Sequence, residues 1–386
     1  MRLVSSETLG LARSILERSS ICDNCLGRQF AQLSTGMTNR ERGRILRGEL
    51  GIPETKKKCS VCSGFFQGIE GYAKEAVRLL KELEFRSFAV GTIMSSDLIK
   101  REESLWEDVG IEHCETLKAE SNRELGKIIE KKTRKRVDEK NPEVNVILNL
   151  QKNRIELQIN PLFVSGKYKK LVRGIPQTKW DKYKETVEDI IAKPIMSYSM
   201  GSGHAMHAAG REDIDARCLD WRPFVFEILG PRKRSLKLKE MGAKINRSGK
   251  VKVKDLRFSS RKDVAETKSM QPDKTYRAIV VFENPLKNGG LDAMNGVLGR
   301  IRQKTPKRVM HRRADKTRVR QVKGIRWRVI NNKKLEIEIK GEAGLYIKEL
   351  VTGDDGRTSP SISELLKNPA RVESLDVVKI HLKKSV

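Results

Sequence analysis

The sequence contains no hydrophobic run that could cross a bilayer, because a membrane-spanning helix needs about 20 consecutive apolar residues. Residues 1–20 also lack the uninterrupted apolar stretch of a secretory signal. We therefore expect a protein that has no membrane partner and stays in the cytoplasm. Thiols remain reduced in that compartment, so paired cysteines indicate metal or redox chemistry rather than disulfides.

Nucleotide-binding loops are also missing from the sequence. The only candidate, Met200–Gly203, is followed next by Gly210, which is the wrong spacing for G-x-G-x-x-G, and no P-loop pattern is present. Enzymes that hold a nucleotide cofactor in such a loop are therefore disfavoured. No internal repeat or low-complexity segment is visible either.

Acidic residues are scarce relative to basic ones. The chain has 79 lysines and arginines against 50 aspartates and glutamates, which gives a formal charge of +29. This charge favours a polyanionic partner, and nucleic acid is the leading one because neutralising its phosphates releases counterions. The alternative is a basic surface that is simply solvated. A membrane is a weaker alternative, because no long basic helix with an aromatic or leucine-rich face is visible.

The length of 386 residues predicts two or three domains. Apolar spacing predicts helices over 7–16, 70–83 and 291–302, and a further helix that opens at the capping box Ser121–Glu124. Alternation predicts strands over 85–92, 144–150, 155–159, 223–228 and 276–282, and a hairpin over 325–339. We place the main domain boundary near Gly166, after a change in composition. The tryptophans Trp180, Trp221 and Trp327 are interpreted as core residues.

Two C-x-x-C pairs, Cys22/Cys25 and Cys59/Cys62, are separated by 33 residues. Each pair presents two thiolates from one tight turn, and two pairs supply the four sulfur ligands of a tetrahedral structural zinc site. Four protein ligands leave no open position for catalysis. An iron–sulfur cluster and four unligated thiols are the alternatives, and the sequence leaves the identity of the metal open.

A cluster of acidic residues and arginines, Gly210–Arg217, precedes the strand predicted over 223–228. Charged side chains at the end of a strand destabilise the fold unless they form ion pairs or take part in binding or catalysis. The cluster is therefore either a set of surface ion pairs or part of a functional site. A second segment, Gly344–Leu350, follows the hairpin. If the strand continues through it, Tyr346 and Lys348 share one face, where the ring can stack on a base and the ammonium can keep a carboxylate ionised.

Gly210-Arg-Glu-Asp213 resembles the G-R-x-D catalytic motif of pseudouridine synthases. Gly344–Leu350 resembles their later motif G-T-Y-I-K/R-x-L, with Leu345 in place of the threonine. Several longer segments resemble one family, the archaeal and eukaryotic tRNA pseudouridine synthase ten family, which acts at T-loop positions 54 and 55 of tRNA. These segments are Ile21–Phe30, Val172–Thr178, Gly210–Arg217, Lys304–Arg320 and Gly353–Pro360. The resemblance runs from about Ile21 to Leu366, nearly the whole chain.

The resemblance implies an α+β protein in three parts. These are a zinc-binding N-terminal region over 1–66, a THUMP-like RNA-binding domain over 67–165, and a catalytic domain over 166–386 with a mixed, largely antiparallel sheet flanked by helices. It also implies an isomerase, a tRNA pseudouridine(54/55) synthase, that needs no catalytic cofactor and binds the T-arm of tRNA as a monomer. The sequence itself leaves open the oligomeric state and whether both uridines are modified.

The same resemblance assigns roles to individual residues. Asp213 acts at the ribose as nucleophile or base, either by attack at C1′ or by removal of the 2′ proton. Tyr346 stacks on the uracil, Lys348 pairs with Asp213, and Arg211 contacts the RNA backbone near the flipped nucleotide. Asp215 is the rival carboxylate, because it lies two residues further on and can share a face with Asp213.

The segment Thr305–Arg328, here called the basic segment, holds ten lysines and arginines and one acidic residue. It resembles a thumb-like loop that covers tRNA in the family, and a loop so charged suits a phosphate backbone. Its candidate phosphate contacts are Arg312, Arg313, Arg318 and Arg320. A solvated run of charge is the alternative.

Two other functions stay open at this point. The first is a non-catalytic RNA-binding protein with a degenerate enzyme domain, and an intact set of Asp213, Tyr346 and Lys348 argues against it. The second is another THUMP-bearing enzyme, such as an RNA methyltransferase or a thiouridine-forming ligase. The missing nucleotide loop argues against that one.

Overall fold

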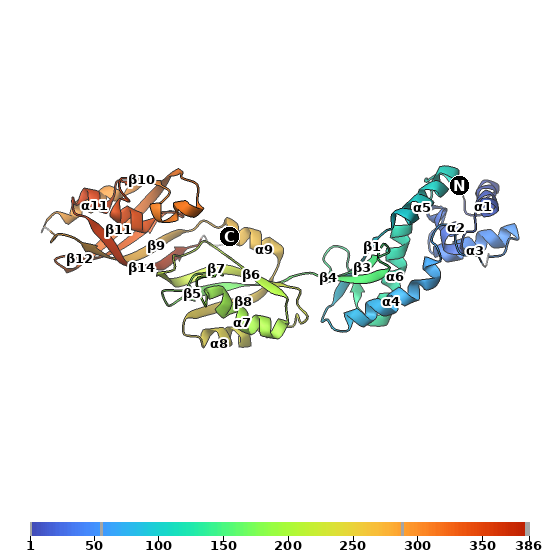
Figure 1. Ribbon diagram of the computed structural model, residues 1–386, viewed down its shortest axis with the longest axis horizontal. Coiled ribbons are helices and arrows are strands. Elements are labelled where there is room, and N and C mark those ends of the chain that lie inside the picture. Colours follow the sequence, from blue (N-terminus) through green and yellow to red (C-terminus); the bar gives the residue numbers. More distant parts are fainter. Residues whose placement is uncertain (1, 55–56, 287–288, 383–386) are drawn as a thin grey trace. The chain divides into compact units, whose positions relative to one another are not determined.

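The computed structural model describes residues 2–54, 57–286 and 289–382, except for the side chain of Arg312. The chain divides into two compact units (Figure 1). Unit 1 is the chain up to Pro161 together with Gly230–Arg234, and unit 2 is Leu162–Leu229 together with the chain from Ser235 onward. Within the described ranges, no helix has the length and apolar character that a membrane span requires.

Unit 1 consists of small helices around the cysteine pairs, followed by a four-stranded sheet covered by longer helices (Figure 1). Its helices are α1 (Ser6–Arg18), α2 (Asp23–Arg28), the 3-10 turn η1 (Ala31–Leu33), α3 (Asn39–Leu50), α4 (Phe65–Leu80), α5 (Ser96–Val109) and α6 (Leu117–Thr133). Its strands are β1 (Ser87–Ile93), β2 (Arg136–Val137), β3 (Val144–Asn149) and β4 (Arg154–Ile159), in the order β2-β1-β3-β4. β1 is parallel to β2 and β3, whereas β3 and β4 form an antiparallel hairpin.

One continuous core joins the cysteine region to the sheet. It runs from Ile15 in α1 to Val146 in β3 and includes Phe65, Ile69 and Ala73 at successive turns of α4. Burying one large apolar side chain contributes roughly 1.5–3 kcal/mol, so separating the two parts would be costly. The expected boundary between residues 66 and 67 therefore falls inside α4, and the two regions form one unit.

The helix expected to open at Ser121 begins one turn earlier, so that expectation was wrong. Thr116 is the N-cap of α6, and its hydroxyl accepts a hydrogen bond from the Ala119 amide at 3.1 Å. Ser121 is buried inside the helix and donates its hydroxyl to the Leu117 carbonyl at 2.7 Å. Serine at i and glutamate at i+3 resemble a capping box, but a serine can equally bond back to the carbonyl four residues earlier within a helix.

Unit 2 is built on one ten-stranded mixed sheet (Figure 1). Its strands are β5 (Leu162–Lys170), β6 (Gly203–Ala208), β7 (Ala216–Leu229), β8 (Val251–Ser259), β9 (Asp273–Phe282), β10 (Gly299–Lys304), β11 (Thr317–Asn331), β12 (Lys334–Gly341), β13 (Thr358–Ser359) and β14 (Ala370–His381). Its helices are α7 (Val187–Ser199), α8 (Leu238–Asn246), α9 (Arg261–Ser269), η2 (Leu291–Val297), η3 (Lys307–Arg312), α10 (Ile347–Thr352) and α11 (Ile362–Leu365). The strand order is β13-β10-β11-β12-β9-β14-β7-β5-β8, with β6 paired to β7.

Two large cores lie along this sheet, one among β5 to β8 and the other among the strands from β9 onward. α7 and α8 pack against β5 to β8, whereas α10, α11 and η2 pack against the strands from β9 onward. β14 is antiparallel to β9 but parallel to β7, where Leu375–Val377 lies beside Ala216–Cys218. This short parallel seam joins the two halves of the sheet. The α+β class and the mixed, largely antiparallel sheet expected from the sequence are confirmed.

The main boundary was expected near Gly166, and the chain divides between Pro161 and Leu162, at the start of β5. One further expectation for unit 2 was wrong. The helix expected over 291–302 is the short turn η2 followed by strand β10. In β10, Ile301 and Gln303 are buried while Arg300 and Arg302 are exposed. That alternation is the period of a strand, not of a helix.

Candidate active site and cysteine cluster

A cavity of about 550 Å³ lies in unit 2, where the β14–β7 seam meets η3 and α10. This volume lies within the range of about 300–1,000 Å³ that is typical of pockets for small ligands. Both motif segments that were identified from the sequence line it. The lining residues are Trp180, Gly210–Ala216, Lys274, Tyr276, Arg308, Val309, His311, Arg313, Gly344–Lys348, Leu375 and Val377.

A buried lysine of β5 holds the loop that carries Asp213. Lys170 Nζ donates to the carbonyl oxygens of Ile175 at 2.7 Å, Asp213 at 3.1 Å and Ile214 at 3.0 Å. These three acceptors satisfy all three donors of the ammonium. Burial lowers the pKa of Lys170. The lysine is thus a fixed support under the loop rather than a group that faces the cavity.

A buried ion pair supports the start of the same loop. The side chains of Glu212 and Arg222 are fully buried, with Arg222 Nη2 3.1 Å from Glu212 Oε2. The Tyr168 hydroxyl donates to Glu212, and Gln177 Nε2 donates to the Tyr168 hydroxyl at 2.7 Å and to the Gly210 carbonyl at 3.0 Å. Gly210 has φ of 79°, and a Cβ there would lie 3.2 Å from Arg222 Nη1. This position therefore needs glycine.

Asp213 lies at the cavity wall between two cations. Its side chain is 34% exposed, and Arg308 Nη1 lies 3.1 Å from Oδ2. The same guanidinium reaches the buried Glu349, with Nε 2.7 Å from Oε1. Burial disfavours the charged guanidinium, but these two carboxylates outweigh it and raise the pKa of Arg308. Arg308 therefore stays cationic and holds Asp213 in a defined position.

Lys348 is shared between two carboxylates. Its Nζ lies 2.6 Å from Asp215 Oδ2 and 3.7 Å from Asp213 Oδ2. Burial opposes ionisation of Asp215, but the hydrogen bond from Lys348 outweighs it and lowers the pKa of Asp215 below its usual value. The pairing of Lys348 with Asp213 that the resemblance implied is the longer of the two contacts, and Asp213 has its shorter contact with Arg308.

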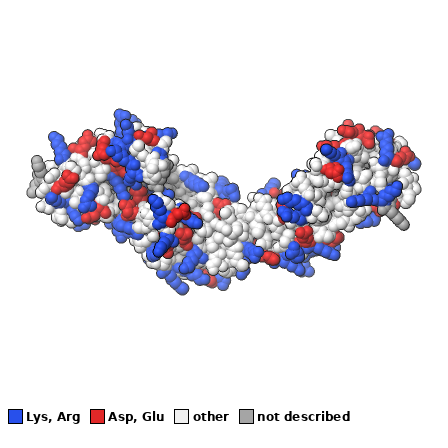
Figure 2. Space-filling view, viewed as in Figure 1, with Lys and Arg blue, Asp and Glu red and all other residues white. Residues whose placement is uncertain are grey.

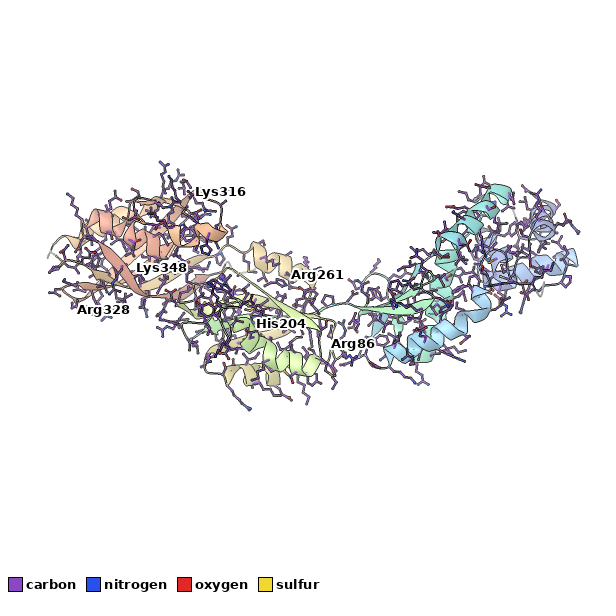
Figure 3. The ribbon with its side chains drawn as sticks, viewed as in Figure 1. Arg86, His204, Arg261, Lys316, Arg328 and Lys348 are labelled. Carbon is purple, nitrogen blue, oxygen red and sulfur yellow. The ribbon has the colours of Figure 1, made fainter. Side chains whose placement is uncertain are left out.

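Tyr346 and Lys348 do not lie on a continuing strand, so that expectation was wrong. β12 ends at Gly341, Gly344 takes a left-handed turn with φ of 83°, and α10 begins directly after Tyr346, its N-cap. Ile347, Leu350 and Val351 bury the inner side of α10 at helical spacing. Lys348, which is also labelled in Figure 3, reaches the cavity from the first turn of this helix.

The backbone of Tyr346 is fixed by a buried glutamine. Gln303 Nε2 donates to the Tyr346 carbonyl at 2.9 Å, and the Tyr346 amide donates to Gln303 Oε1 at 2.9 Å. The Tyr346 hydroxyl accepts from Arg313 Nη1 at 2.9 Å. The ring is half-buried and lines the cavity. A ring held at its backbone and at its hydroxyl presents a defined surface for a planar ligand.

Sequence reasoning missed several residues of the cavity. Arg308 was counted only as part of the basic segment, although it contacts Asp213. Trp180, which was interpreted as a core residue, lines the cavity and packs 5.5 Å from the ring of Tyr183. Lys274 also lines it, and burial beside Arg222 lowers the pKa of Lys274 to about 8. No local pattern marks these residues, because tertiary pairing brings them together.

The candidate phosphate contacts are spread over different elements. Arg211 is exposed at the wall of the cavity. The basic segment is not one loop, because η3 and β11 make up most of it. Arg318 and Arg320 are half-buried on β11 and Arg313 is exposed, whereas the side chain of Arg312 lies outside the described part. Figure 2 shows lysine and arginine side chains gathered over the β10 and β11 part of unit 2.

The four cysteines of the two C-x-x-C pairs form one cluster in unit 1. All four are buried, and their sulfur atoms lie within 4.8 Å of one another. Cys22 Sγ and Cys62 Sγ are 3.7 Å apart. The edge of a tetrahedron with Zn–S bonds of about 2.3 Å is about 3.8 Å, so the spacing fits a tetrahedral ion. The Cys22 amide also donates to Cys59 Sγ at 3.4 Å, as is typical of thiolate ligands.

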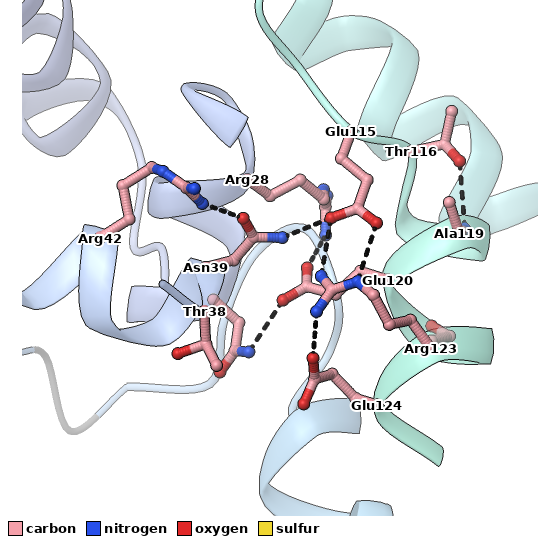
Figure 4. A network of polar contacts seen from close by, with 12 residues as sticks. Arg28, Thr38, Asn39, Arg42, Glu115, Thr116, Ala119, Glu120, Arg123 and Glu124 are labelled. Atoms are coloured by element: carbon pink, nitrogen blue, oxygen red, sulfur yellow. Dashed lines mark hydrogen bonds and ion pairs between the residues drawn. The ribbon is translucent and has the colours of Figure 1, made fainter. Parts of the chain in front are cut away.

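A buried arginine links this cluster to the helices over the sheet. Arg28 is fully buried, with Nη1 3.4 Å from Cys25 Sγ and Nη2 3.3 Å from Glu102 Oε1 of α5. Glu120 of α6 lies 3.7 Å from Nη1. Figure 4 shows the neighbouring bond between α3 and this region, where Asn39 Nδ2 donates to Glu115 at 2.7 Å. The cysteine cluster and the sheet-covering helices therefore share one polar network.

Comparisons with known proteins cover nearly the whole chain. The family model described as Pus10, C-terminal, matches residues 163–381, and the model described as Pus10 THUMP domain, archaeal, matches residues 72–149. A protein named tRNA pseudouridine synthase Pus10 from Methanothrix thermoacetophila is 39% identical, over 98% of this chain and 95% of that protein. One of the same name from Pyrococcus furiosus is 38% identical, over 96% and 97%.

Among solved structures, a chain of a Cbf5-Nop10-Gar1 complex matches with a TM-score of 0.35 and 16% identity, over 55% of this chain and 48% of that one. Similarity at that level does not establish a shared fold. The sequence relatives, by contrast, are matched along almost their full length.

Proposed function

The chain belongs to the family of the tRNA pseudouridine synthase Pus10, and from this membership we propose that it isomerises uridine to pseudouridine at T-loop positions 54 and 55 of tRNA. The observation that carries the proposal is the placement of Asp213. The carboxylate lies at the wall of a cavity beside two cations and near the half-buried ring of Tyr346.

The proposed reaction needs base extrusion, a carboxylate and a held uracil. A uridine in a folded T-loop has to leave its stack to enter the cavity, as in other enzymes that act on bases. Asp213 then acts at the ribose, and the C1′–N1 bond breaks. The uracil turns, C5 bonds to C1′, the proton on C5 is lost and N1 gains a proton. Attack at C1′ and removal of the 2′ proton both begin from the carboxylate of Asp213, which lies 3.1 Å from Arg308 and 3.7 Å from Lys348.

The remaining residues of the cavity hold the substrate. Tyr346 stacks on the uracil, in a position that Gln303 and Arg313 define. Arg211, exposed at the cavity wall, contacts a phosphate beside the extruded nucleotide. The reaction rearranges bonds within one nucleotide, so it consumes no second substrate, and we propose that it needs no catalytic cofactor. The protein accelerates the reaction by binding and orienting the nucleotide and by stabilising the charge of the transition state.

We also propose that the cysteine cluster holds a structural zinc ion. Cys22, Cys25, Cys59 and Cys62 would be its four ligands, a set that leaves no open position for chemistry. The ion would stabilise unit 1, which carries the segment matched by the THUMP model. Unit 1 would then contribute to tRNA binding.

The test uses the full chain and unmodified tRNA transcripts, with pseudouridine located by carbodiimide derivatisation and primer extension. We expect wild-type protein, without added cofactor, to modify positions 54 and 55, and transcripts with cytidine at either position to be modified only at the other. Asp213→Asn removes the charge at constant volume and should abolish the product while tRNA affinity stays within a few-fold.

Asp215→Asn is the matched control, because it removes a neighbouring carboxylate paired to the same lysine. An active Asp213→Asn together with an inactive Asp215→Asn would move the assignment to Asp215. Wild-type protein that binds tRNA but forms no pseudouridine would favour a non-catalytic RNA-binding protein. Product at one position only would restrict the proposal to that uridine.

A further inference from the structure

The part of the unit 2 sheet formed by β7, β5 and β8 has two different faces. Val164 of β5 and Val253 of β8 point into the core beneath α7 and α8. Residues next to them along each strand point to the opposite face, because side chains alternate in a strand. At one end of that second face α9 packs against β6 and β7, with Arg261 5.7 Å from the centre of the Phe163 ring (Figures 1 and 3).

The other end of this face carries four lysines around a tryptophan, here called the lysine face: Lys167 and Lys169 of β5, Lys252 and Lys254 of β8, and Trp221 of β7. Lys167 lies directly opposite Lys254 across the strand pair, and Lys169 directly opposite Lys252. The Nζ atoms of Lys169 and Lys254 lie 4.8 and 4.7 Å from the centre of the Trp221 ring. Trp221, interpreted as a core residue from the sequence, is only half-buried.

This arrangement is unfavourable for the isolated fold. Like charges directly opposite each other in a sheet are destabilising, and here two such pairs are adjacent. Asp255 contacts Lys167 at 3.4 Å and Lys254 at 3.9 Å, but it is one acidic group among four lysines and is itself 51% exposed. The charges are therefore better explained by an anion that binds from outside.

We propose that the lysine face is a second RNA-binding surface, on which Trp221 stacks on an unpaired base while the four lysines contact neighbouring phosphates. The proposal rests on the proposed function, which supplies an RNA substrate. An aromatic ring flanked by cations suits nucleic acid better than an acidic protein, because every base offers a flat π surface and every nucleotide a phosphate. Lys252 and Lys254 are exposed, so a nucleotide chain can reach this face.

The RNA bound here differs from the nucleotide in the cavity. Tyr168 and Lys170, which hold the Asp213 loop, point to the α7 side of β5, whereas Lys167 and Lys169 point to the other side. One extruded uridine cannot reach both sides of the sheet. The bound segment is thus a part of the substrate tRNA outside the T-loop, or a second RNA molecule.

The test compares variants of the full chain in tRNA binding across a salt series. Lys169→Ala/Lys252→Ala removes one opposed pair and should flatten the slope of log affinity against log salt by about 1.4–1.8 units, because each phosphate contact contributes about 0.7–0.9. Trp221→Leu should weaken binding about fivefold or more, in keeping with the loss of one stacked base. The matched control is Lys193→Ala/Lys244→Ala on α7 and α8, two exposed lysines on the covered side of the sheet, which should change neither quantity.

Thermal denaturation of the same variants separates binding from structure. Removing an opposed lysine pair should leave the melting temperature unchanged or raise it, because the repulsion is relieved. Unchanged affinity and salt slope in both variants would overturn the proposal, as would a loss of stability that accounts for the loss of binding. Reduced binding of an acidic protein from the same cell, with RNA binding intact, would assign the face to a protein instead.

An isolated T-arm hairpin distinguishes the sources of the RNA. If the variants bind full tRNA weakly but bind the hairpin normally, a part of the tRNA outside the T-arm contacts the lysine face. If the affinities for full tRNA and for the hairpin fall equally, the T-arm stem contacts the lysine face. If the wild type binds two tRNA molecules per chain at saturation and the variants bind one, the face binds a second RNA molecule. Each result supports the surface. The proposed function fails separately, if wild-type protein forms no pseudouridine whatever these variants bind.

Discussion

Arg308 is the residue whose replacement tests the active site most directly. Its guanidinium joins Asp213, at 3.1 Å, to the buried Glu349, at 2.7 Å. Arg308→Met keeps most of the side-chain length and removes the charge. We expect a loss of stability, because Glu349 is left without its cation. We also expect a loss of rate, because Asp213 then keeps only the more distant contact with Lys348, at 3.7 Å.

The size of both effects follows from the burial of the three groups. Removing one partner of a buried ion pair costs about 3–5 kcal/mol. Because Arg308 is 36% exposed, solvent screening reduces this to about 1–3 kcal/mol. In a unit of this size each kcal/mol lowers the melting temperature by about 2–4 °C, so we expect a fall of roughly 2–12 °C. If the poorer placement of Asp213 raises the activation free energy by about 1.4 kcal/mol, the reaction slows about tenfold.

The double variant Arg308→Met/Glu349→Gln separates the two effects. Glu349→Gln removes the stranded carboxylate, so thermal denaturation should show most of the lost stability restored. Single-turnover rates at saturating enzyme should stay low, because Asp213 still lacks Arg308. Additive losses of stability would show that Arg308 and Glu349 are not coupled. A wild-type rate in Arg308→Met would refute the role of Arg308 beside Asp213.

Three further predictions concern other parts of the chain. Elemental analysis of wild-type protein should find about one zinc per chain, and Cys59→Ser should lose the metal and destabilise unit 1, because ligation is coupled to folding; metal-free wild-type protein would contradict this. Reversing the charge of Arg312, Arg318 and Arg320, with Arg313 kept because it holds the Tyr346 hydroxyl, should weaken tRNA binding and flatten its salt dependence by about 2–3 units, far more than it slows single turnover; an unchanged slope would mean a solvated surface. Burial lowers the pKa of Lys274 to about 8, so between pH 8 and about 10.4 the unfolded chain holds a proton that the folded chain has lost. Stability of the wild type should therefore rise through this window by up to about 1.4 kcal/mol per pH unit relative to Lys274→Met, and parallel curves would count against it.

Local patterns in the sequence predicted the structure correctly where the structure depends on residues close together in the chain. Alternation over 144–150 and 155–159 predicted the hairpin of β3 and β4, because each strand buries one face. The spacing of the cysteine pairs predicted a four-sulfur cluster, because each pair is a single tight turn. Short motifs such as Gly210–Asp213 identified the cavity segments, because their residues act within one loop.

Contacts between distant segments could not be predicted in this way. Arg308 and Asp213 are 95 residues apart, and only the meeting of η3 with the β14–β7 seam brings them together. The helix α10 was not predicted, for a different reason. Its apolar spacing at Ile347, Leu350 and Val351 fits a helix, but the preceding alternation of β12 favoured a continuing strand. The turn at Gly344 that separates the two has no unique signature.

The β14–β7 seam makes the cavity the last part of unit 2 that a growing chain can assemble. The loop with Asp213 precedes β7, and α10 with Lys348 follows β12, yet β14 (Ala370–His381) is the strand hydrogen-bonded to both β7 and β9. While the ribosome still holds that strand, the sheet remains in two halves and the two motif segments have no common wall. The cavity therefore cannot form before β14 has been synthesised. Because these pairings span more than 150 residues, unit 2 also folds slowly compared with proteins built from local contacts.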